Sequence, residues 1–177
     1  MAAASTARYV LLQYGDDPFC LNFEDQGGNL AFVVEKVAKD PNLIVKLNRR
    51  DDWVQRYPDI LGPRNSYFYF GPSLSPGQVA YGNSERIPMA YYLRRKKEAS
   101  PSRYFNAQSG PELKWKAVSA TRMELWDSRS ILAIWEKNLS GSEHDAQVTL
   151  SHTAMTLITE VLTTLCLNFV ALRLGWP

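Results

Sequence analysis

The sequence predicts a mainly β, antiparallel domain that ends in a single apolar helix. Short stretches rich in apolar and aromatic residues recur along most of the chain, and Gly, Pro, Asn and Asp separate them. Aromatic residues make up 12% of the chain and suit a half-buried pleated surface. The last long stretch, residues 153–172, contains neither Gly nor Pro. About a dozen short strands with regular turns favour a barrel or a sandwich.

The first half of the chain has five expected strands. They lie at residues 9–14, 19–23, 30–37, 43–47 and 67–70. Gly27 and Gly28 favour a hairpin between the second and the third strand, because glycine readily adopts the positive φ that such turns require.

The middle of the chain is expected to be looser. Residues 71–84 contain several Gly, Pro and Ser residues, which predicts a long loop around a short segment at 78–81. Strand character resumes at residues 87–93, and Pro88 there indicates the start of a strand or an edge position.

The second half gives the clearest strand pattern. Alternation of apolar and polar residues predicts strands at 113–118 and 123–126, and a turn at 127–130 joins the latter to a strand at 131–135. A final strand is expected at residues 146–150.

Residues 153–172 are expected to form a helix in the core of the protein. Ser151 or Thr153 can cap its start, and Gly175 and Pro177 follow its end. Apolar residues cover nearly every side, which requires burial in protein or in a membrane. Only twelve residues separate Glu160 from Arg173, whereas a membrane span needs about 20, so a core helix is favoured. The threonines of this helix can donate to backbone carbonyls, which makes them tolerable in the interior.

Length and composition indicate one reduced, cytoplasmic domain. The 177 residues are 45% hydrophobic and 21% charged, as in an ordinary globular domain. Cys20 and Cys166 both lie in apolar stretches and are expected to be buried free thiols. Residues 1–7 lack the basic flank and apolar core of a signal peptide.

The second half of the chain resembles a known family. The segments that carry the resemblance are Gly110-Pro-Glu-Leu-Lys-Trp-Lys116, Met123-Glu-Leu-Trp-Asp127 and Ile131-Leu-Ala-Ile-Trp135, followed by the apolar helix. This order resembles the tubby-like superfamily, which includes phospholipid scramblase-like and LURP-one-related proteins, and it looks most like an uncharacterised fungal branch. The resemblance covers about residues 109–176. It implies that residues 1–177 form a single domain, an antiparallel barrel of about twelve strands around the C-terminal helix. It also implies lipid headgroup or membrane-surface binding as one use of the fold, and no catalytic residues.

Charge is concentrated in one segment. Residues 86–122 contain nine Lys or Arg but only two Asp or Glu, although the whole chain has a net charge of only +2. This segment predicts a patch that binds anionic lipid headgroups, such as phosphoinositides, or a peripheral membrane surface. A solvated loop is the structural alternative. The candidate residues are Arg94, Arg95, Lys96, Lys97, Arg86, Arg103, Lys114 and Lys116. Nucleic acid is disfavoured as a partner, because the pI near 8.5 is below that of most dedicated binders.

Two other functions remain open. The chain has no linear catalytic, nucleotide-binding or metal-binding motif and only two histidines, so a non-enzymatic protein without a cofactor or metal is favoured. A barrel that binds a small molecule, as a carrier or an enzyme, is the first alternative, although ordinary packing explains the same residues. Its pocket would be lined by His152, Glu160, Tyr67, Tyr69, Tyr91 and Tyr92. A protein-interaction module is the second alternative, and a large exposed apolar patch would favour it.

Overall fold

Thirteen strands form one antiparallel sheet in the computed structural model, which describes residues 8–177. The prediction about a signal peptide concerns residues 1–7 and lies outside the described residues. The strands are β1 (Tyr9–Tyr14), β2 (Leu21–Asp25), β3 (Leu30–Ala38), β4 (Ile44–Arg49), β5 (Asn65–Tyr69), β6 (Gln78–Tyr81), β7 (Ile87–Pro88), β8 (Arg94–Arg95), β9 (Arg103–Asn106), β10 (Glu112–Ser119), β11 (Arg122–Trp126), β12 (Ile131–Lys137) and β13 (Ala146–Leu150).

The sheet is continuous but not closed by hydrogen bonds. Strands β1 to β7 follow one another in order, β1 pairs with β13, and the order then descends from β13 to β8. The two-residue strands β7 and β8 are therefore the edges, and the expected closed barrel of about twelve strands is an open sheet of thirteen. Pro88 helps to limit β7, because it lacks a backbone N–H and a helical turn begins directly after it.

The predicted C-terminal helix is confirmed, with one break. It consists of α3 (His152–Thr156) and α4 (Ile158–Leu174), which meet at Leu157. The Ser151 hydroxyl caps α3 by accepting from the backbone N–H of Ala154 at 3.1 Å, and Gly175 ends α4 in the left-handed conformation with φ of 63°. No helix within residues 8–177 has the length and apolar character needed to cross a bilayer.

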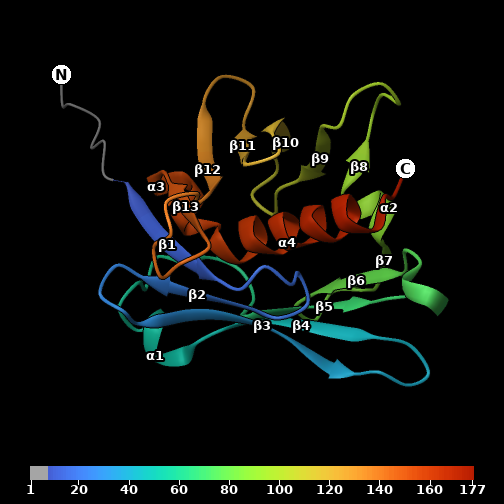
Figure 1. Ribbon diagram of the computed structural model, residues 1–177, viewed down its shortest axis with the longest axis horizontal. Coiled ribbons are helices and arrows are strands. Elements are labelled where there is room, and N and C mark those ends of the chain that lie inside the picture. Colours follow the sequence, from blue (N-terminus) through green and yellow to red (C-terminus); the bar gives the residue numbers. More distant parts are fainter. Residues whose placement is uncertain (1–7) are drawn as a thin grey trace.

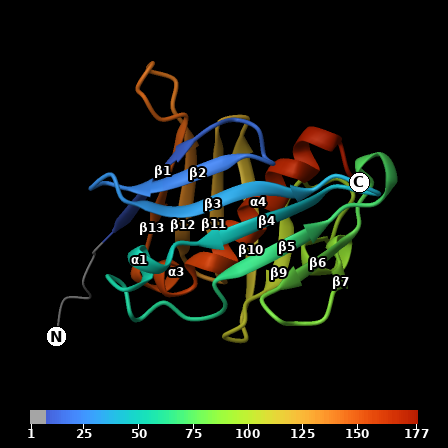
Figure 2. The same cartoon turned by 90° about the horizontal axis from the view of Figure 1, so that it is seen from below.

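Helix α4 lies between two parts of the sheet. Strands β8 to β12 lie on one side of it and β2 to β7 on the other (Figure 1). Seen from below, β2 to β5 cross in front of α4, and β10 to β13 lie behind it (Figure 2). Leu162, Leu165 and Cys166 have no exposed surface, so α4 fills the interior with a single apolar core.

Polar side chains also attach α4 to the sheet. The indole N–H of Trp115 donates to the hydroxyl of Thr164 at 2.8 Å, and Ser66 shares a hydrogen bond of 2.8 Å with Thr163. As expected for buried threonines, Thr163 and Thr164 also donate to carbonyls one turn earlier in the helix. Thr159 instead accepts from Arg49 at 3.2 Å. These bonds fix the position of α4 relative to β4, β5 and β10.

Several local predictions were wrong. The strand expected at residues 87–93 is β7 followed by the short helix α2 (Met89–Tyr92), in which Met89 is buried while Tyr91 is exposed. The expected loop at 71–84 contains a 3₁₀ turn, η1 (Pro72–Leu74), and the paired strand β6. Helix α1 (Asp51–Val54) and the short strands β8 and β9 were not expected. Cys166 is buried as predicted, but Cys20 is exposed because β2 begins one residue after it.

Candidate functional site

A row of alternating cations and aromatic rings crosses the outer face of β8 to β11. In the strand register Arg94 is opposite Tyr104, Tyr104 is opposite Lys114, and Lys114 is opposite Trp126. Residues directly opposite each other in a sheet point to the same face, so these four side chains lie side by side. The intervening residues face the core, as the complete burial of Trp115 illustrates.

Two further lysines extend this row. Lys116 is the next outward residue along β10, and Lys96 follows β8 with its ammonium group 4.2 Å from the centre of the Tyr104 ring. We call Arg94, Lys96, Tyr104, Lys114, Lys116 and Trp126 the basic face. Lys97 is exposed beside Lys96; its backbone carbonyl accepts from the N–H of Ser100, but its side chain forms no hydrogen bond or ion pair with another residue in the range 8–177.

One carboxylate is held between two cations of the basic face. Glu112 accepts from Nη2 of Arg94 at 2.6 Å, and its other oxygen accepts from the ammonium group of Lys96. Arg94 also donates to the side-chain oxygen of Asn106 at 2.7 Å. The hydrogen bonds from Lys96 and Arg94 lower the pKa of Glu112 below its usual value. The geometry of Arg94 and Lys96 thus accommodates a planar anion.

The remaining predicted cations have structural partners elsewhere. Arg95 donates to the backbone carbonyls of Ser100, at 3.2 Å, and of Glu98. Arg103 is only 9% exposed and donates to the carbonyls of two residues at the end of the chain. Arg86 stacks on the ring of Tyr69, 3.8 Å from its centre. Of the eight predicted residues, the structure therefore brings four together, with Lys97 beside them.

The residues of the alternative pocket do not line one cavity. Tyr67 and Tyr69 stack on each other on the outer face of β5, because Ser66 and Phe68 take the inward positions. His152 is exposed. Tyr91, another of the predicted pocket residues, is exposed over 75% of its surface. The interior is filled by α4, so a ligand-holding barrel has little structural support.

The carboxylate of Glu160 and the hydroxyl of Tyr92 are the exception, because both are buried. Glu160 is 3% exposed, and its carboxylate accepts from the backbone N–H of Gln108 at 3.0 and 3.1 Å. Burial raises the pKa of Glu160 to about 6. Burial first, and the charge of Glu160 second, raise the pKa of Tyr92 well above its usual value.

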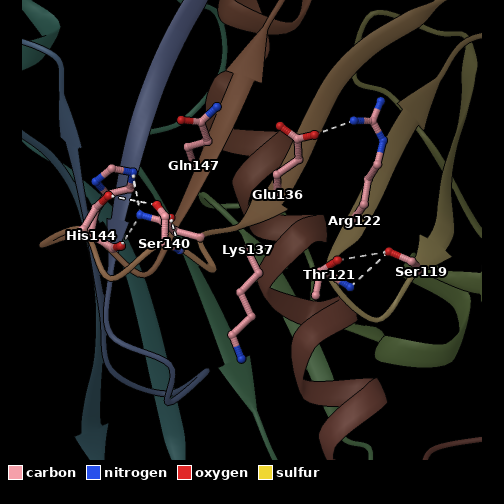
Figure 3. A pocket seen from close by; sticks show the side chains of 10 residues that line it. Ser119, Thr121, Arg122, Glu136, Lys137, Ser140, His144 and Gln147 are labelled. Carbon is pink, nitrogen blue, oxygen red and sulfur yellow. Dashed lines mark hydrogen bonds and ion pairs between the residues drawn. The ribbon is translucent and has the colours of Figure 1, made fainter.

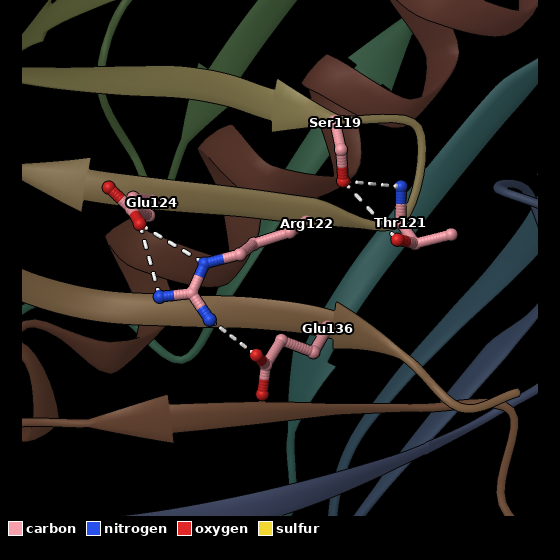
Figure 4. A network of polar contacts seen from close by, with 5 residues as sticks. All are labelled: Ser119, Thr121, Arg122, Glu124 and Glu136. Carbon is pink, nitrogen blue, oxygen red and sulfur yellow. Dashed lines mark hydrogen bonds and ion pairs between the residues drawn. The ribbon is translucent and has the colours of Figure 1, made fainter. Parts of the chain in front are cut away.

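A polar groove at the ends of β10 to β13 was missed by the sequence analysis. It has a volume of about 510 Å³, and its lining includes Ser119, Arg122, Glu136, Lys137 and His144 (Figure 3). Within it the guanidinium of Arg122 contacts Glu136, and behind it the same group contacts Glu124 at 3.1 Å (Figure 4). Since these carboxylates neutralise Arg122, the groove offers polar hydrogen-bonding groups without a strong positive charge. Strand alternation places Arg122 and Glu136 outward, but their meeting depends on the register, which the sequence does not specify.

The described part of the chain assembles no metal site, and one of its two thiols is buried. No three His, Cys, Asp or Glu side chains converge within residues 8–177. Cys166 is fully buried, and burial raises the pKa of its thiol, which disfavours the reactive thiolate.

Comparisons with known proteins give no relative. The chain matches no protein-family model, no curated protein and no solved structure. A functional assignment therefore depends on the geometry of these sites.

Proposed function

We propose that the protein is a non-enzymatic binding domain that recognises anionic lipid headgroups at a membrane surface through the basic face. The alternating row of Arg94, Tyr104, Lys114 and Trp126 is the observation that carries this proposal. Each Lys or Arg near an anionic membrane contributes about 1 kcal/mol, and Tyr and Trp rings favour the headgroup level of a bilayer. A face that interleaves both kinds of side chain suits this interface.

The support within the basic face is uneven. Arg94 and Lys96 are partly neutralised by Glu112, whereas Lys114 and Lys116 form no ion pair with another residue between 8 and 177. Lys114 and Lys116 both belong to β10, whose inner side is anchored by Leu113 and Trp115 in the core. The two lysines are thus presented by a rigid strand and are the strongest candidates for headgroup contact.

Element order supports the wider family proposal. The resemblance to the tubby-like superfamily implies an antiparallel sheet followed by one apolar core helix, and this order is present, although the sheet is open where the resemblance implies a closed barrel. Lipid headgroup binding is one use of that fold. Fold likeness alone does not assign a function, so the basic face is the part to test.

The protein-interaction alternative has less support. Large exposed apolar side chains occur, but they are spread over many elements: Val37 on β3, Leu61 before β5, Ile87 on β7, Tyr91 on α2, Val118 on β10, Ile131 on β12, Leu139 after β12 and Leu172 on α4. Single exposed apolar residues of this kind are normal on monomeric proteins.

Co-sedimentation with vesicles tests the proposal. Neutral phosphatidylcholine vesicles are compared with vesicles that also contain phosphatidylserine or a phosphoinositide, at low and at physiological ionic strength. We expect selective pelleting with the anionic vesicles that weakens with salt. The double variant Lys114→Glu with Lys116→Glu should bind at least about thirtyfold more weakly, since it removes two favourable charges of about 1 kcal/mol each and adds two repulsive ones.

A matched double variant controls for net charge. Lys36→Glu with Lys39→Glu makes the same charge change at the exposed end of β3, away from the basic face. We expect this variant to retain most of the binding. Equal losses in both double variants, or a wild-type protein that pellets with no vesicle, would show that the basic face is only a solvated surface.

A further inference from the structure

The last turns of α4 leave apolar side chains uncovered. Every residue of α4 from Ile158 to Asn168 is buried, whereas Phe169 is half-buried and Leu172 is 59% exposed. Both line a pocket of about 470 Å³, which lies between this part of α4, the turn from β1 to β2, and the joined ends of β12 and β13. We call it the apolar pocket. Its volume is within the range of small-molecule sites, about 300 to 1,000 Å³.

The buried part of the lining is apolar and aromatic. Trp135 of β12 is only 9% exposed, and the centre of its ring lies 5.1 Å from the centre of the Phe169 ring. Leu21 and Ala146, both buried, also line the apolar pocket. None of the six residues predicted for the alternative pocket takes part in it. The interior of the apolar pocket therefore suits a hydrocarbon group.

Hydrogen bonds hold the wall of the apolar pocket in place. The indole N–H of Trp135 donates to Gln13 at 3.0 Å, and the amide of Gln13 donates to the carbonyl of Gly15 at 3.1 Å. The N–H of Gly15 in turn donates to the carboxylate of Asp145 at 2.7 Å. Gly15 has a φ of 98°, and a Cβ there would lie 2.8 Å from the carbonyl oxygen of Cys20, so the turn requires glycine. A wall that is already ordered lowers the entropic cost of binding a ligand.

Two cations lie at the mouth of the apolar pocket. Lys137 follows Trp135 by two residues on β12 and pairs with the buried Ala146, so strand alternation places it on the inward face. Its side chain points away from that of Glu136 (Figure 3). Arg173 lies at the end of α4 and lines the same pocket. None of the ion pairs within residues 8–177 includes either cation.

Two carboxylates share this mouth, but they are less able to reach a ligand. Asp145 is held on the turn by the N–H of Gly15. Asp16 is exposed beside it and has a short side chain. Lys and Arg carry their charge at the end of a long, flexible stem, so Lys137 and Arg173 can extend over the mouth. The mouth therefore favours an anionic group over a cationic one, and Asp16 weakens this preference.

We propose that the apolar pocket binds a single-chain amphiphile of the fatty-acid class. The hydrocarbon chain lies against Trp135 and Phe169, and the carboxylate lies between Lys137 and Arg173. Charge complementarity selects this ligand, because the interior of the pocket takes a chain and the two cations take one anionic group. No residue of the basic face lines the apolar pocket, so this proposal and the proposed membrane binding can fail independently.

Isothermal titration with dodecanoate, below its micelle concentration, tests the proposal. We expect the wild-type protein to bind dodecanoate more tightly than dodecyltrimethylammonium, which has the same chain and the opposite charge. Lys137→Gln with Arg173→Gln should weaken dodecanoate binding at least about tenfold, because charge-assisted contacts to the carboxylate are lost. Lys114→Gln with Lys116→Gln makes the same charge change on the basic face and should bind dodecanoate as the wild type does.

Two single variants test the rest of the apolar pocket. Leu172→Gln replaces an exposed apolar side chain of the lining and should weaken dodecanoate binding about tenfold, whereas Leu139→Gln, at a position that is 77% exposed and outside the lining, should not. Asp16→Asn should strengthen binding, since it removes a carboxylate from the mouth. The proposal is overturned if the wild-type protein binds no dodecanoate, if it binds dodecyltrimethylammonium equally well, or if the pocket variants bind dodecanoate like their controls.

Discussion

Glu124 on β11 and Glu160 on α4 are both nearly buried, at 9% and 3% exposure, but their surroundings differ. Glu124 accepts from the guanidinium of Arg122 at 3.1 Å and from the indole N–H of Trp126 at 2.9 Å (Figure 4). Among residues 8–177, Glu160 accepts from one backbone N–H, that of Gln108. The first carboxylate belongs to an ion-pair network on the outer face of the sheet, in which Arg122 contacts two carboxylates, and the second pairs with no cation in the described part of the chain.

The difference follows from where each element places its side chains. The outer face of an antiparallel sheet sets residues of neighbouring strands side by side, so Arg122 on β11 meets Glu136 on β12 directly across the ladder. A position on the central helix instead faces the segments that pack around it, and for Glu160 the donor among residues 8–177 is a backbone N–H, that of Gln108 after β9. Unfavourable burial is typical of groups whose protonation changes with function, so Glu160 is the group to perturb.

The largest expected effect is a charge reversal made once in each region. Glu160→Lys places a cation at a position that is only 3% exposed, which should lower the free energy of unfolding by about 3 to 5 kcal/mol. Glu136→Lys breaks an exposed ion pair with Arg122, and surface pairs contribute little. Urea denaturation of both variants at pH 7 measures the contrast. Equal losses of unfolding free energy in the two variants would show that burial at position 160 adds no cost to the introduced charge.

The next largest effect is the contribution of Glu160 to the pH dependence of the free energy of unfolding. Its folded pKa of about 6 lies above the usual 4.5, so the folded state binds the extra proton, and stability falls as pH rises from about 4.5 to above 6. The full cost is about 2 kcal/mol, because a pKa difference of one between the folded and unfolded states corresponds to about 1.36 kcal/mol. Relative to the wild type, Glu160→Gln should therefore gain about 2 kcal/mol between pH 4.5 and pH 7.

Other carboxyls act in the opposite direction, which is why the difference between the two proteins is the quantity to measure. Hydrogen bonds from Lys96 and Arg94 lower the pKa of Glu112, and backbone hydrogen bonds from Arg129 and Ser130 lower the pKa of Asp127. Their stabilising contribution is lost as pH falls below about 4.5, outside the window of Glu160. A difference between wild type and Glu160→Gln that stays constant from pH 4 to pH 8 would show that the pKa of Glu160 is the same in the folded and unfolded states.

Long periodic elements were predictable from the sequence, and short ones were not. The strand at 146–150 and the body of the C-terminal helix appear as expected, because each has several residues of consistent period. Residues 87–93 form an apolar run that is too short for its pattern to distinguish a strand from a helical turn. The helical turn α2 forms there, with Met89 packed in the core. Closure of the sheet depends on contacts between β7 and β8 that no local pattern encodes.

The candidate site was predictable as a region but not residue by residue. Local charge density directs attention to the segment that contains β8 to β10, and alternation along β10 places Lys114 and Lys116 on the same side. The role of Arg103 could not be foreseen, since its carbonyl partners, Trp176 and Pro177, are more than seventy residues away in the sequence.

The smallest expected effect concerns Glu112 and tests whether its carboxylate weakens anion binding by the basic face. The carboxylate of Glu112 occupies the position between Arg94 and Lys96 that a phosphate oxygen would need. Glu112→Gln should therefore strengthen binding to anionic vesicles by about fivefold, because it frees two cations as well as removing one negative charge.

Glu98→Gln is the matched control: it makes the same charge change in the loop after β8, where only the backbone carbonyl of Glu98 contacts Arg95. A gain in Glu112→Gln alone would identify Glu112 as a built-in competitor for the lipid phosphate. Equal gains in both variants would show that Glu112 affects binding only through the net charge of the protein. A loss in Glu112→Gln would show that Glu112 instead orients Arg94 and Lys96 for the headgroup.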